Sequence, residues 1–273
     1  RYRVNNKKVV IELFCKAFDE PAEYLDVTDN ENMVVRLQNT LAVIGVPSFG
    51  GRVPAIAAER IKNIRGNNTP AFILTTYGNR AYDDTLNELR SIVESNGFVV
   101  AGAASIVSRH SIVTDIAADR PDSKDIKEIK DYAKEFKNKL LNSHNINGIE
   151  NIPGNEKFRD FGGVPFSPQP TKQCVSCGIC AEKCPVGAIG KDYKADSEKC
   201  IACMRCVSVC PNGARAVSKL ALKMVSLKLH KVCADRKENE HFYIKSKNIS
   251  RFIAYYLQIL NIFYVYRTCF SVV

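Results

Sequence analysis

The sequence lacks several features that would place it in a common functional class. No arginine-rich run and no aromatic RNA-binding motif accompany its formal net charge of +10, so the charge does not indicate a nucleic-acid-binding protein. Its start shows no charged segment followed by an apolar core and a small-residue cleavage site, as a signal peptide would. No constellation of catalytic acid, base and nucleophile is visible. We therefore predict a cytoplasmic protein that does not bind nucleic acid.

Long apolar runs are also absent. The best candidate, residues 252–266, is interrupted by Gln258 and Asn261 and ends at Arg267. A membrane-spanning helix needs about 20 predominantly apolar residues, so we do not expect one. Two other interpretations of the tail, residues 245–273, stay open. It is either an interfacial or partner-binding helix aided by nearby basic residues, or an extension without function.

What the chain does have is cysteine. Eight of its eleven cysteines fall within 37 residues, as two copies of the pattern C-x2-C-x2-C-x3-C-P. In this pattern three thiolates wrap one iron–sulfur cluster, and the fourth, followed by proline, ligates the other cluster. The spacing therefore predicts two [4Fe–4S] clusters with crossed ligation. The first set is Cys174, Cys177, Cys180 and Cys210, and the second is Cys200, Cys203, Cys206 and Cys184.

Two other uses of these cysteines are less consistent with the pattern. Zinc sites contain C-x2-C pairs, but not four close cysteines that end in Cys-Pro and repeat. Disulfides need an oxidising compartment, which nothing in the sequence predicts. Residues 172–216 thus resemble the bacterial two-cluster ferredoxin, a small α+β domain. Cys15 and Cys233 lie outside the ligand spacing, and we expect them to be packed or free thiols.

The first 148 residues alternate between helical and strand patterns, which predicts an α/β domain with a parallel sheet. The expected strands are residues 22–27, 40–46, 71–76 and 98–103. The expected helices are residues 6–18, 53–64 and 125–141, with another that contains Leu86 and ends at Gly97.

Two loops at the carboxyl ends of expected strands are candidates for ligand binding, because ligands of open parallel sheets bind at that edge. Their sequences are PSFGGR and YGNRAYD. Glycine allows the backbone to approach a flat ring closely, and the aromatic side chains could stack on it. Ordinary turns are the alternative. The candidate ring-binding residues are Pro47, Ser48, Phe49, Gly50, Gly51, Tyr77, Gly78, Asn79 and Tyr82.

The stretches GVPSFGGRVPA, TTYGNRAYDD and CADRKENEHF resemble those of the flavodoxin–ferredoxin fusion proteins, and the match covers about residues 7–244. The resemblance implies an FMN-binding, flavodoxin-like domain with strand order 2-1-3-4-5, followed by two [4Fe–4S] motifs. The family's phosphate loop should precede Lys7, but no such loop is present there. We therefore expect the first strand and the phosphate loop to be missing or altered, with Asn5 and Asn6 left to donate to a phosphate at the helix N-terminus.

The resulting domain plan has five parts. It comprises a flavodoxin-like domain (1–148), a linker (149–171), a ferredoxin domain (172–216), a C-terminal helix (217–244) and an atypical tail (245–273). The proline-rich linker is either semi-extended or packed across the first domain through its phenylalanines. For His110 we expect a surface or packed histidine, and for Arg52 and Arg80 solvated loop charges.

These patterns predict an electron-transfer protein that passes low-potential electrons between redox partners, either proteins or small-molecule acceptors. Its cofactors would be two [4Fe–4S] clusters and FMN, which together link one-electron and two-electron partners. Two alternatives stay open. One is a flavin-dependent reductase with a built-in ferredoxin module, and the other is a docking protein whose flavodoxin-like domain holds no flavin. An electron carrier is favoured over a substrate-specific enzyme.

Overall fold

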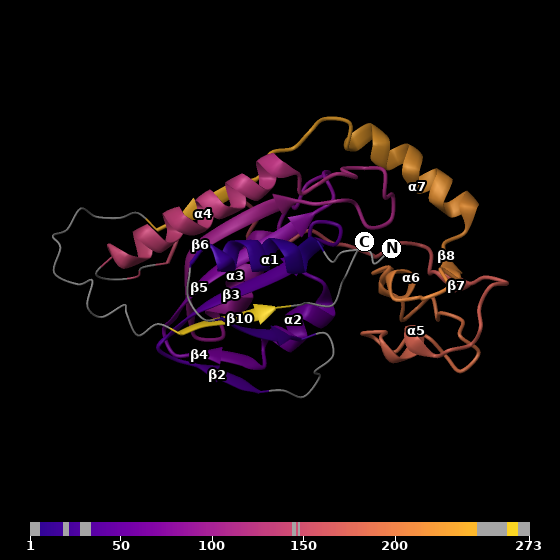
Figure 1. Ribbon diagram of the computed structural model, residues 1–273, viewed down its shortest axis with the longest axis horizontal. Helices are drawn as coiled ribbons and strands as arrows, with labels where there is room; N and C mark the ends of the chain where they lie inside the picture. Colours follow the sequence, from indigo (N-terminus) through magenta and orange to yellow (C-terminus); the bar gives the residue numbers. More distant parts are fainter. Residues whose placement is uncertain are drawn as a thin grey trace.

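The structure, a computed structural model, describes residues 6–18, 22–27, 34–143, 146, 148–244 and 261–266 (Figure 1). The helices are α1 (Asn6–Lys16), α2 (Ala55–Ile61), α3 (Thr85–Glu94), α4 (Ser123–Leu141), α5 (Ile179–Glu182), α6 (Arg205–Ser208) and α7 (Lys219–Val232). The strands are β1 (Ala22–Asp26), β2 (Val35–Leu37), β3 (Thr40–Pro47), β4 (Ile64–Gly66), β5 (Thr69–Tyr77), β6 (Phe98–Val107), β7 (Gln169–Pro170), β8 (Arg215–Ala216), β9 (Glu240–Tyr243) and β10 (Asn261–Tyr266).

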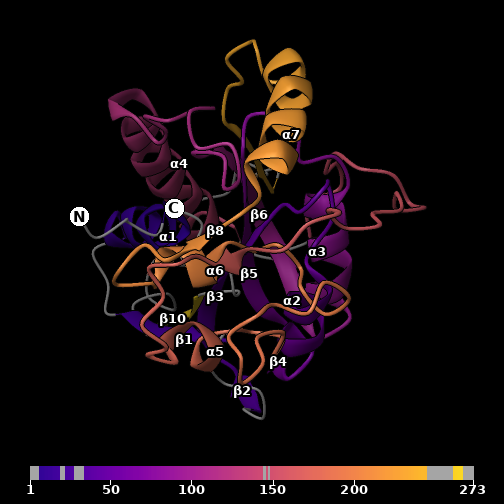
Figure 2. The ribbon, with the colours of Figure 1, turned by 90° about the vertical axis from the view of Figure 1, so that its right-hand side faces the viewer.

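The main sheet has the order β1-β10-β3-β5-β6-β9. Its first five strands are parallel, and β9 pairs antiparallel with β6 at the edge. Helices α1 and α4 cover one face, while α2 and α3 cover the other (Figure 2). This is the mixed α/β architecture with a parallel sheet that the alternating pattern predicts.

The core lies on both faces of the sheet because its inner strands are apolar throughout. All eight residues of β3 are buried, as expected for a parallel strand covered on both faces. Under α1 and α4, the ring of Phe72 stacks on Phe14 at 4.1 Å and meets Phe136 at 4.8 Å between ring centroids. A Cβ on Gly102 would lie 2.6 Å from the Phe72 ring, so only glycine allows this close approach.

Strand β10 occupies the inner position of the sheet that the resemblance assigns to the first strand. It lies parallel between β1 and β3, with Ile262 opposite Ala22 on one side and Leu41 on the other. Residues 261–266 of the tail therefore contribute a strand to the sheet, and the function of the tail stays a prediction. An inner strand position leaves two rows of backbone groups to be paired, and this segment of β-branched and aromatic residues suits a strand.

Numbered along the chain, the five parallel strands have the order 1-5-2-3-4 and not the 2-1-3-4-5 that the resemblance implies, because the last described strand and not the first holds the inner position beside β1. The assignment to a flavodoxin-like family stays a prediction. A second correction concerns residues 53–64, which were expected to form one helix. Helix α2 ends at Ile61, and Ile64 begins β4, which pairs with β2 in a separate two-stranded sheet. The Asn63 carbonyl accepts a hydrogen bond from the Val35 N–H at 3.0 Å, so the backbone pairs with β2 directly after α2 ends.

The linker packs across the α/β domain. The buried carboxylate of Asp84 accepts hydrogen bonds from the N–H groups of Asn155 at 2.9 Å and Arg159 at 2.6 Å. Burial opposes the charge on Asp84, but these donors outweigh it and hold the pKa of the carboxyl below its ordinary value. The phenyl ring of Phe161 lies against Gly50, where a Cβ would come within 2.1 Å of the ring.

After α7 the chain returns to the sheet as β9, so the predicted C-terminal helix is only the first part of that segment. Ser218 precedes helix α7 as its N-cap, and its hydroxyl accepts a hydrogen bond from the Ala221 N–H. None of the helices in the described residues combines the length and the apolar run that crossing a bilayer would require.

Candidate redox site

The cysteine-rich region is built as two copies of one backbone pattern, offset by 26 residues in the sequence. Ser176 and Ala202 occupy equivalent positions and have φ values of 56° and 49°. Gly178 and Met204, two residues further on, have φ values of 80° and 60° and begin the short helices α5 and α6. Successive turns of this kind aim backbone N–H groups toward a shared concavity, which suits an anionic group.

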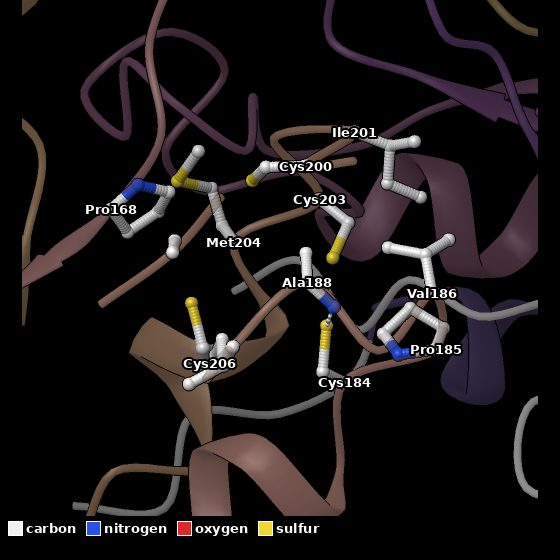
Figure 3. A pocket seen from close by; sticks show the side chains of 12 residues that line it. Pro168, Cys184, Pro185, Val186, Ala188, Cys200, Ile201, Cys203, Met204 and Cys206 are labelled. Carbon is white, nitrogen blue, oxygen red and sulfur yellow. Dashed lines mark hydrogen bonds between the residues drawn. The ribbon is translucent and has the colours of Figure 1, made fainter. Parts of the chain in front are cut away.

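The eight cysteines line two cavities, four to each. Cys184 joins Cys200, Cys203 and Cys206 around the first cavity, where the sulfurs face a common space (Figure 3). Cys210 joins Cys174, Cys177 and Cys180 around the second. In each cavity one cysteine comes from the other copy of the motif. These are the same two sets that the spacing groups together.

The sulfurs do not converge as ligands of a single ion do. Among the described residues, no group of three or more His, Cys, Asp or Glu side chains is arranged to hold one metal ion. Zinc thiolate ligands meet at one centre with Zn–S distances of about 2.3 Å. Four sulfurs around a cavity are the arrangement that a bulkier iron–sulfur cluster requires.

Hydrogen-bond donors are placed at the sulfurs in a matching way in both halves. The Ala188 N–H donates to Cys184 Sγ at 3.2 Å, and the Ala214 N–H donates to Cys210 Sγ at the same distance. The buried guanidinium of Arg215 lies 3.6 Å from Cys180 Sγ. Donors of this kind tune the potential of a cluster by stabilising the negative charge on its sulfurs.

Burial makes these thiols poor acids unless a cation compensates. Removal from water raises the pKa of Cys206 to about 11, although Arg215 acts in the opposite direction. Burial also raises the pKa of Cys200. Iron supplies the positive charge that a buried thiolate needs. The cysteine set, its spacing around two cavities and the N–H donors thus all fit [4Fe–4S] clusters.

Comparison with known protein families agrees with this geometry. The family described as "4Fe-4S binding domain" matches residues 171–190 and again residues 193–216. Residues 171–216 form a 4Fe–4S ferredoxin-type domain. No curated protein matches the chain. The match supports iron–sulfur electron transfer, while the assignment of individual ligands stays a prediction.

Beside the ferredoxin-type domain lies a larger cavity of about 350 Å³. Its walls come from the loops after β3, β5 and β6, the linker, α7 and the ferredoxin-type domain. Five of the predicted ring-binding residues line it: Ser48, Phe49, Gly50, Tyr77 and Gly78. The carboxyl ends of the parallel strands thus point toward the ferredoxin-type domain (Figure 1). The large cavity lies at this edge of the sheet, where ligands of open parallel sheets bind.

The other predicted ring-binding residues do not line the cavity. Pro47 ends β3, and a Cβ on Gly51 would collide with the Asp83 side chain. Asn79 uses its amide to hold the C-terminal segment, donating to the carbonyls of Cys233 and Asp235 at 3.0 Å. The Tyr82 hydroxyl donates to Glu240, and burial together with that carboxylate raises the pKa of Tyr82.

The remaining ring-site candidates from the sequence are Asn5 and Asn6. Asn5 lies outside the described residues, and Asn6 is described only as the first residue of α1.

Arg52 is not a solvated charge, because its guanidinium is bonded to both carboxylate oxygens of Glu88, at 2.7 and 2.8 Å. That pairing raises the pKa of Arg52 and, with a further bond to the Arg159 carbonyl, secures the linker.

The large cavity and the first cluster cavity share a wall. Ile201, which lies between Cys200 and Cys203 in the sequence, lines both cavities. Phe49, from the loop after β3, packs with Ile201 against Cys203. A ring held in the large cavity would therefore contact the same loop that carries two predicted cluster ligands.

Sequence reasoning missed several residues of this cavity. His110, Phe161 and Ile201 line it, yet none belongs to the two loops singled out above. A signal existed for His110, since it lies three residues beyond the end of β6, at the same sheet edge as the other two loops. Phe161 and Ile201 reach the cavity only through packing of the linker and the ferredoxin-type domain, which no local pattern predicts.

The lining of the large cavity contains the aromatic side chains Phe49, Tyr77 and Phe161, on which a flat ring could stack. Its lining offers aromatic surface and two glycines, Gly50 and Gly78, where a Cβ would collide with Phe161 or His110. It contains no Asp or Glu among the described residues, so it does not repel electron-rich carbonyl groups. The positions expected to bind the phosphate lie at or before the start of α1, where no side chain is described.

Proposed function

We propose that this chain is an electron-transfer protein that holds two [4Fe–4S] clusters in crossed ligation and one FMN in the large cavity. The wall shared through Ile201 carries this proposal, because it brings a ring-sized cavity against a loop with two predicted cluster ligands. Electrons would pass between this cavity and an external redox partner by way of the clusters.

When bound, FMN exchanges two electrons while each cluster carries one, so the pair links two-electron and one-electron partners. The chain's own residues would hold the two groups together. Phe49 packs against Cys203 and faces the cavity, so it closes the space between them to water. The Arg52–Glu88 pair and Asp84 hold the linker, which contributes Arg159, Phe161 and Val164 to the cavity wall.

Crossed ligation is tested by removing two cysteines at a time. Wild-type protein reconstituted without oxygen should hold about eight irons, the content of two [4Fe–4S] clusters. Cys180→Ala with Cys210→Ala removes two ligands of one predicted set and should leave about four irons. Cys180→Ala with Cys184→Ala removes one ligand from each set and should leave almost none.

The control is Cys15→Ala, which changes a buried cysteine outside the motifs and should leave the iron content unchanged. The reverse result for the two double variants would show that each motif holds its own cluster and would contradict crossed ligation. If reconstituted wild-type protein shows neither a thiolate-to-iron absorbance band nor an EPR signal on reduction, the electron-transfer function itself fails.

Flavin binding is tested separately. FMN fluorescence should be quenched on titration with the wild type at micromolar concentration. Val164→Trp fills part of the cavity and should weaken binding at least about tenfold, equivalent to about 1.4 kcal/mol. Val34→Trp makes the same change at a position that is 66% exposed and should have no effect. Iron-loaded wild-type protein that binds no FMN would instead favour a docking role for the α/β domain.

A further inference from the structure

His110 lies in the loop after β6 and lines the large cavity. Its backbone N–H donates to the Ile116 carbonyl at 3.1 Å, which closes the loop. Its ring lies against Gly78, where a Cβ would come within 2.5 Å of the ring carbon Cδ2. The glycine of the neighbouring strand-end loop therefore fixes where this imidazole can lie.

The hydrogen bonds of the ring define which nitrogen carries its proton. Nδ1 of His110 accepts from the N–H groups of Ile112 and Val113, both at 3.1 Å. A nitrogen that accepts two N–H bonds cannot itself be protonated. The single proton of the neutral ring must then be on Nε2, for which the described residues offer no acceptor.

The surroundings keep this ring neutral. Burial lowers the pKa of His110 to about 4, the Arg80 guanidinium acts in the same direction, and Asp115 opposes both. At neutral pH the side chain is therefore a donor without charge. It differs in this respect from Arg80 and Arg159, the two charged residues of the cavity wall, which both pair with Asp83.

A neutral donor in an aromatic-lined cavity without carboxylates suits a particular kind of group. Anionic groups would gain more from the arginines, but those already share a carboxylate. A carbonyl oxygen or an unprotonated ring nitrogen accepts one hydrogen bond and carries no full charge, so it matches Nε2–H of His110. Such acceptors occur along the polar edge of a flat heterocycle.

We propose that His110, held as the Nε2–H tautomer by its loop, donates a hydrogen bond to the carbonyl or imine edge of the ring that occupies the large cavity. This inference rests on the proposed function, since it takes FMN as the ring. His110 is thus a positioning residue for the ring.

The test uses two variants that separate the two nitrogens. In His110→Asn the side-chain oxygen can take the place of Nδ1 and hold the loop, but no donor reaches the position of Nε2. In His110→Gln the amide nitrogen reaches that position. Full-length, iron-loaded protein is titrated with FMN, and the affinity should fall at least tenfold in His110→Asn but no more than about threefold in His110→Gln.

The tautomer is read independently from the imidazole ¹⁵N spectrum of the wild type, which should show the proton on Nε2. A proton on Nδ1, a charged ring at pH 7, or equal FMN affinity in the wild type and His110→Asn would overturn the inference. Equal loss in both variants would also overturn it, because the effect would then come from the loop. Wild-type protein that binds no FMN would overturn both this inference and the flavin part of the proposed function, while its iron content reports on the clusters alone.

Discussion

Glycines within the strands of the sheet domain and three glycines of the ferredoxin-type domain are required for different reasons. In the sheet domain Gly45, Gly66 and Gly102 have ordinary backbone angles, but a Cβ at each would lie 2.5 to 2.7 Å from a neighbouring atom. In the ferredoxin-type domain Gly178, Gly187 and Gly213 have positive φ and no described atom within 4 Å of a Cβ. Packing therefore requires glycine at these three strand positions, whereas backbone conformation requires it at the three positions of the ferredoxin-type domain.

The same contrast holds for the cores. No residue of 171–216 belongs to the main apolar core formed by the described residues. The apolar residues buried in this region are cysteines, alanines, Pro185 and one methionine, Met204, which together offer little apolar area. The sheet domain is stabilised by burying large side chains, whereas the ferredoxin-type domain depends on what its cysteines bind. Four changes would break or sharpen this comparison.

Iron removal should have the largest effect, and it should affect only the ferredoxin-type domain. Chelation under reducing conditions should abolish hydrogen-exchange protection of residues 171–216, because metal binding supplies their folding free energy. Strands β3, β5 and β6 should keep their protection, since they bury apolar residues on both faces. Return of iron and sulfide should restore the lost protection. A ferredoxin-type domain that stays protected without iron would contradict the contrast.

Disrupting strand β10 should destabilise the sheet domain. Tyr264→Pro removes an N–H from an inner strand that pairs on both sides, so the free energy of unfolding of the sheet domain should fall by on the order of 3 kcal/mol, measured in urea. Lys219→Pro is the control, because proline is tolerated at the first position of a helix such as α7. Equal stability of the two variants would mean that β10 does not complete the sheet.

Releasing the linker should have a smaller effect. Asp84→Asn replaces one carboxylate oxygen with a donor that faces other donors, so stability should fall by about 2 kcal/mol, within the range for hydrogen bonds to charged groups. Proteolysis of the linker should also become faster. Asp115→Asn, at an exposed carboxylate, should change stability by less than about 0.5 kcal/mol.

The same carboxylate sets a pH dependence. The pKa of Asp84 is lower in the folded protein than its ordinary value of 3.8. Its contribution is therefore fully present above pH 3.8 and is lost as pH falls through the folded pKa. The stability difference between wild type and Asp84→Asn should shrink over that acid range. A constant difference down to that pH would show that the charge of Asp84 plays no part.

The smallest effect concerns backbone conformation in the ferredoxin-type domain. Gly213→Ala meets no described atom but must adopt φ of 58°, so it should cost about 1 kcal/mol through strain alone. Gly190→Ala has an ordinary φ and contacts only the flexible Asp192 side chain, so it should be nearly neutral. Thermal unfolding of the iron-loaded protein compares the two. Equal melting temperatures would remove the backbone argument for this domain.

Much of the fold could be predicted because it rests on local patterns. The apolar run at residues 40–46 forms β3, and the periodic run at residues 125–141 forms most of α4. Helix α4 begins slightly earlier than predicted, at Ser123, after a capping box between Asp122 and Asp125. The grouping of cysteines also followed from spacing alone. By contrast, β10 could not be predicted, because its place depends on pairing with strands more than 200 residues earlier in the chain.

The candidate ring site divides in the same way. Phe49 and Tyr77 could be found because strand ends of a parallel sheet meet at one edge. Asn79 and Tyr82 have similar sequence positions, but they face the C-terminal segment, which contacts them only in the folded chain. The orientation proposed for His110 depends on two backbone N–H groups and on Gly78, and these groups contact the ring only in the folded protein.

The sequence by itself determined the iron–sulfur chemistry, because cluster ligation depends on cysteine spacing over a few residues and proline fixes the chain after the last one. It also determined the α/β pattern through hydrophobic periodicity. Only the tertiary structure decided that β10 completes the sheet and that Ile201 joins the two cavities. Both depend on contacts between distant segments, where the free energy comes from burying surfaces together rather than from any local preference.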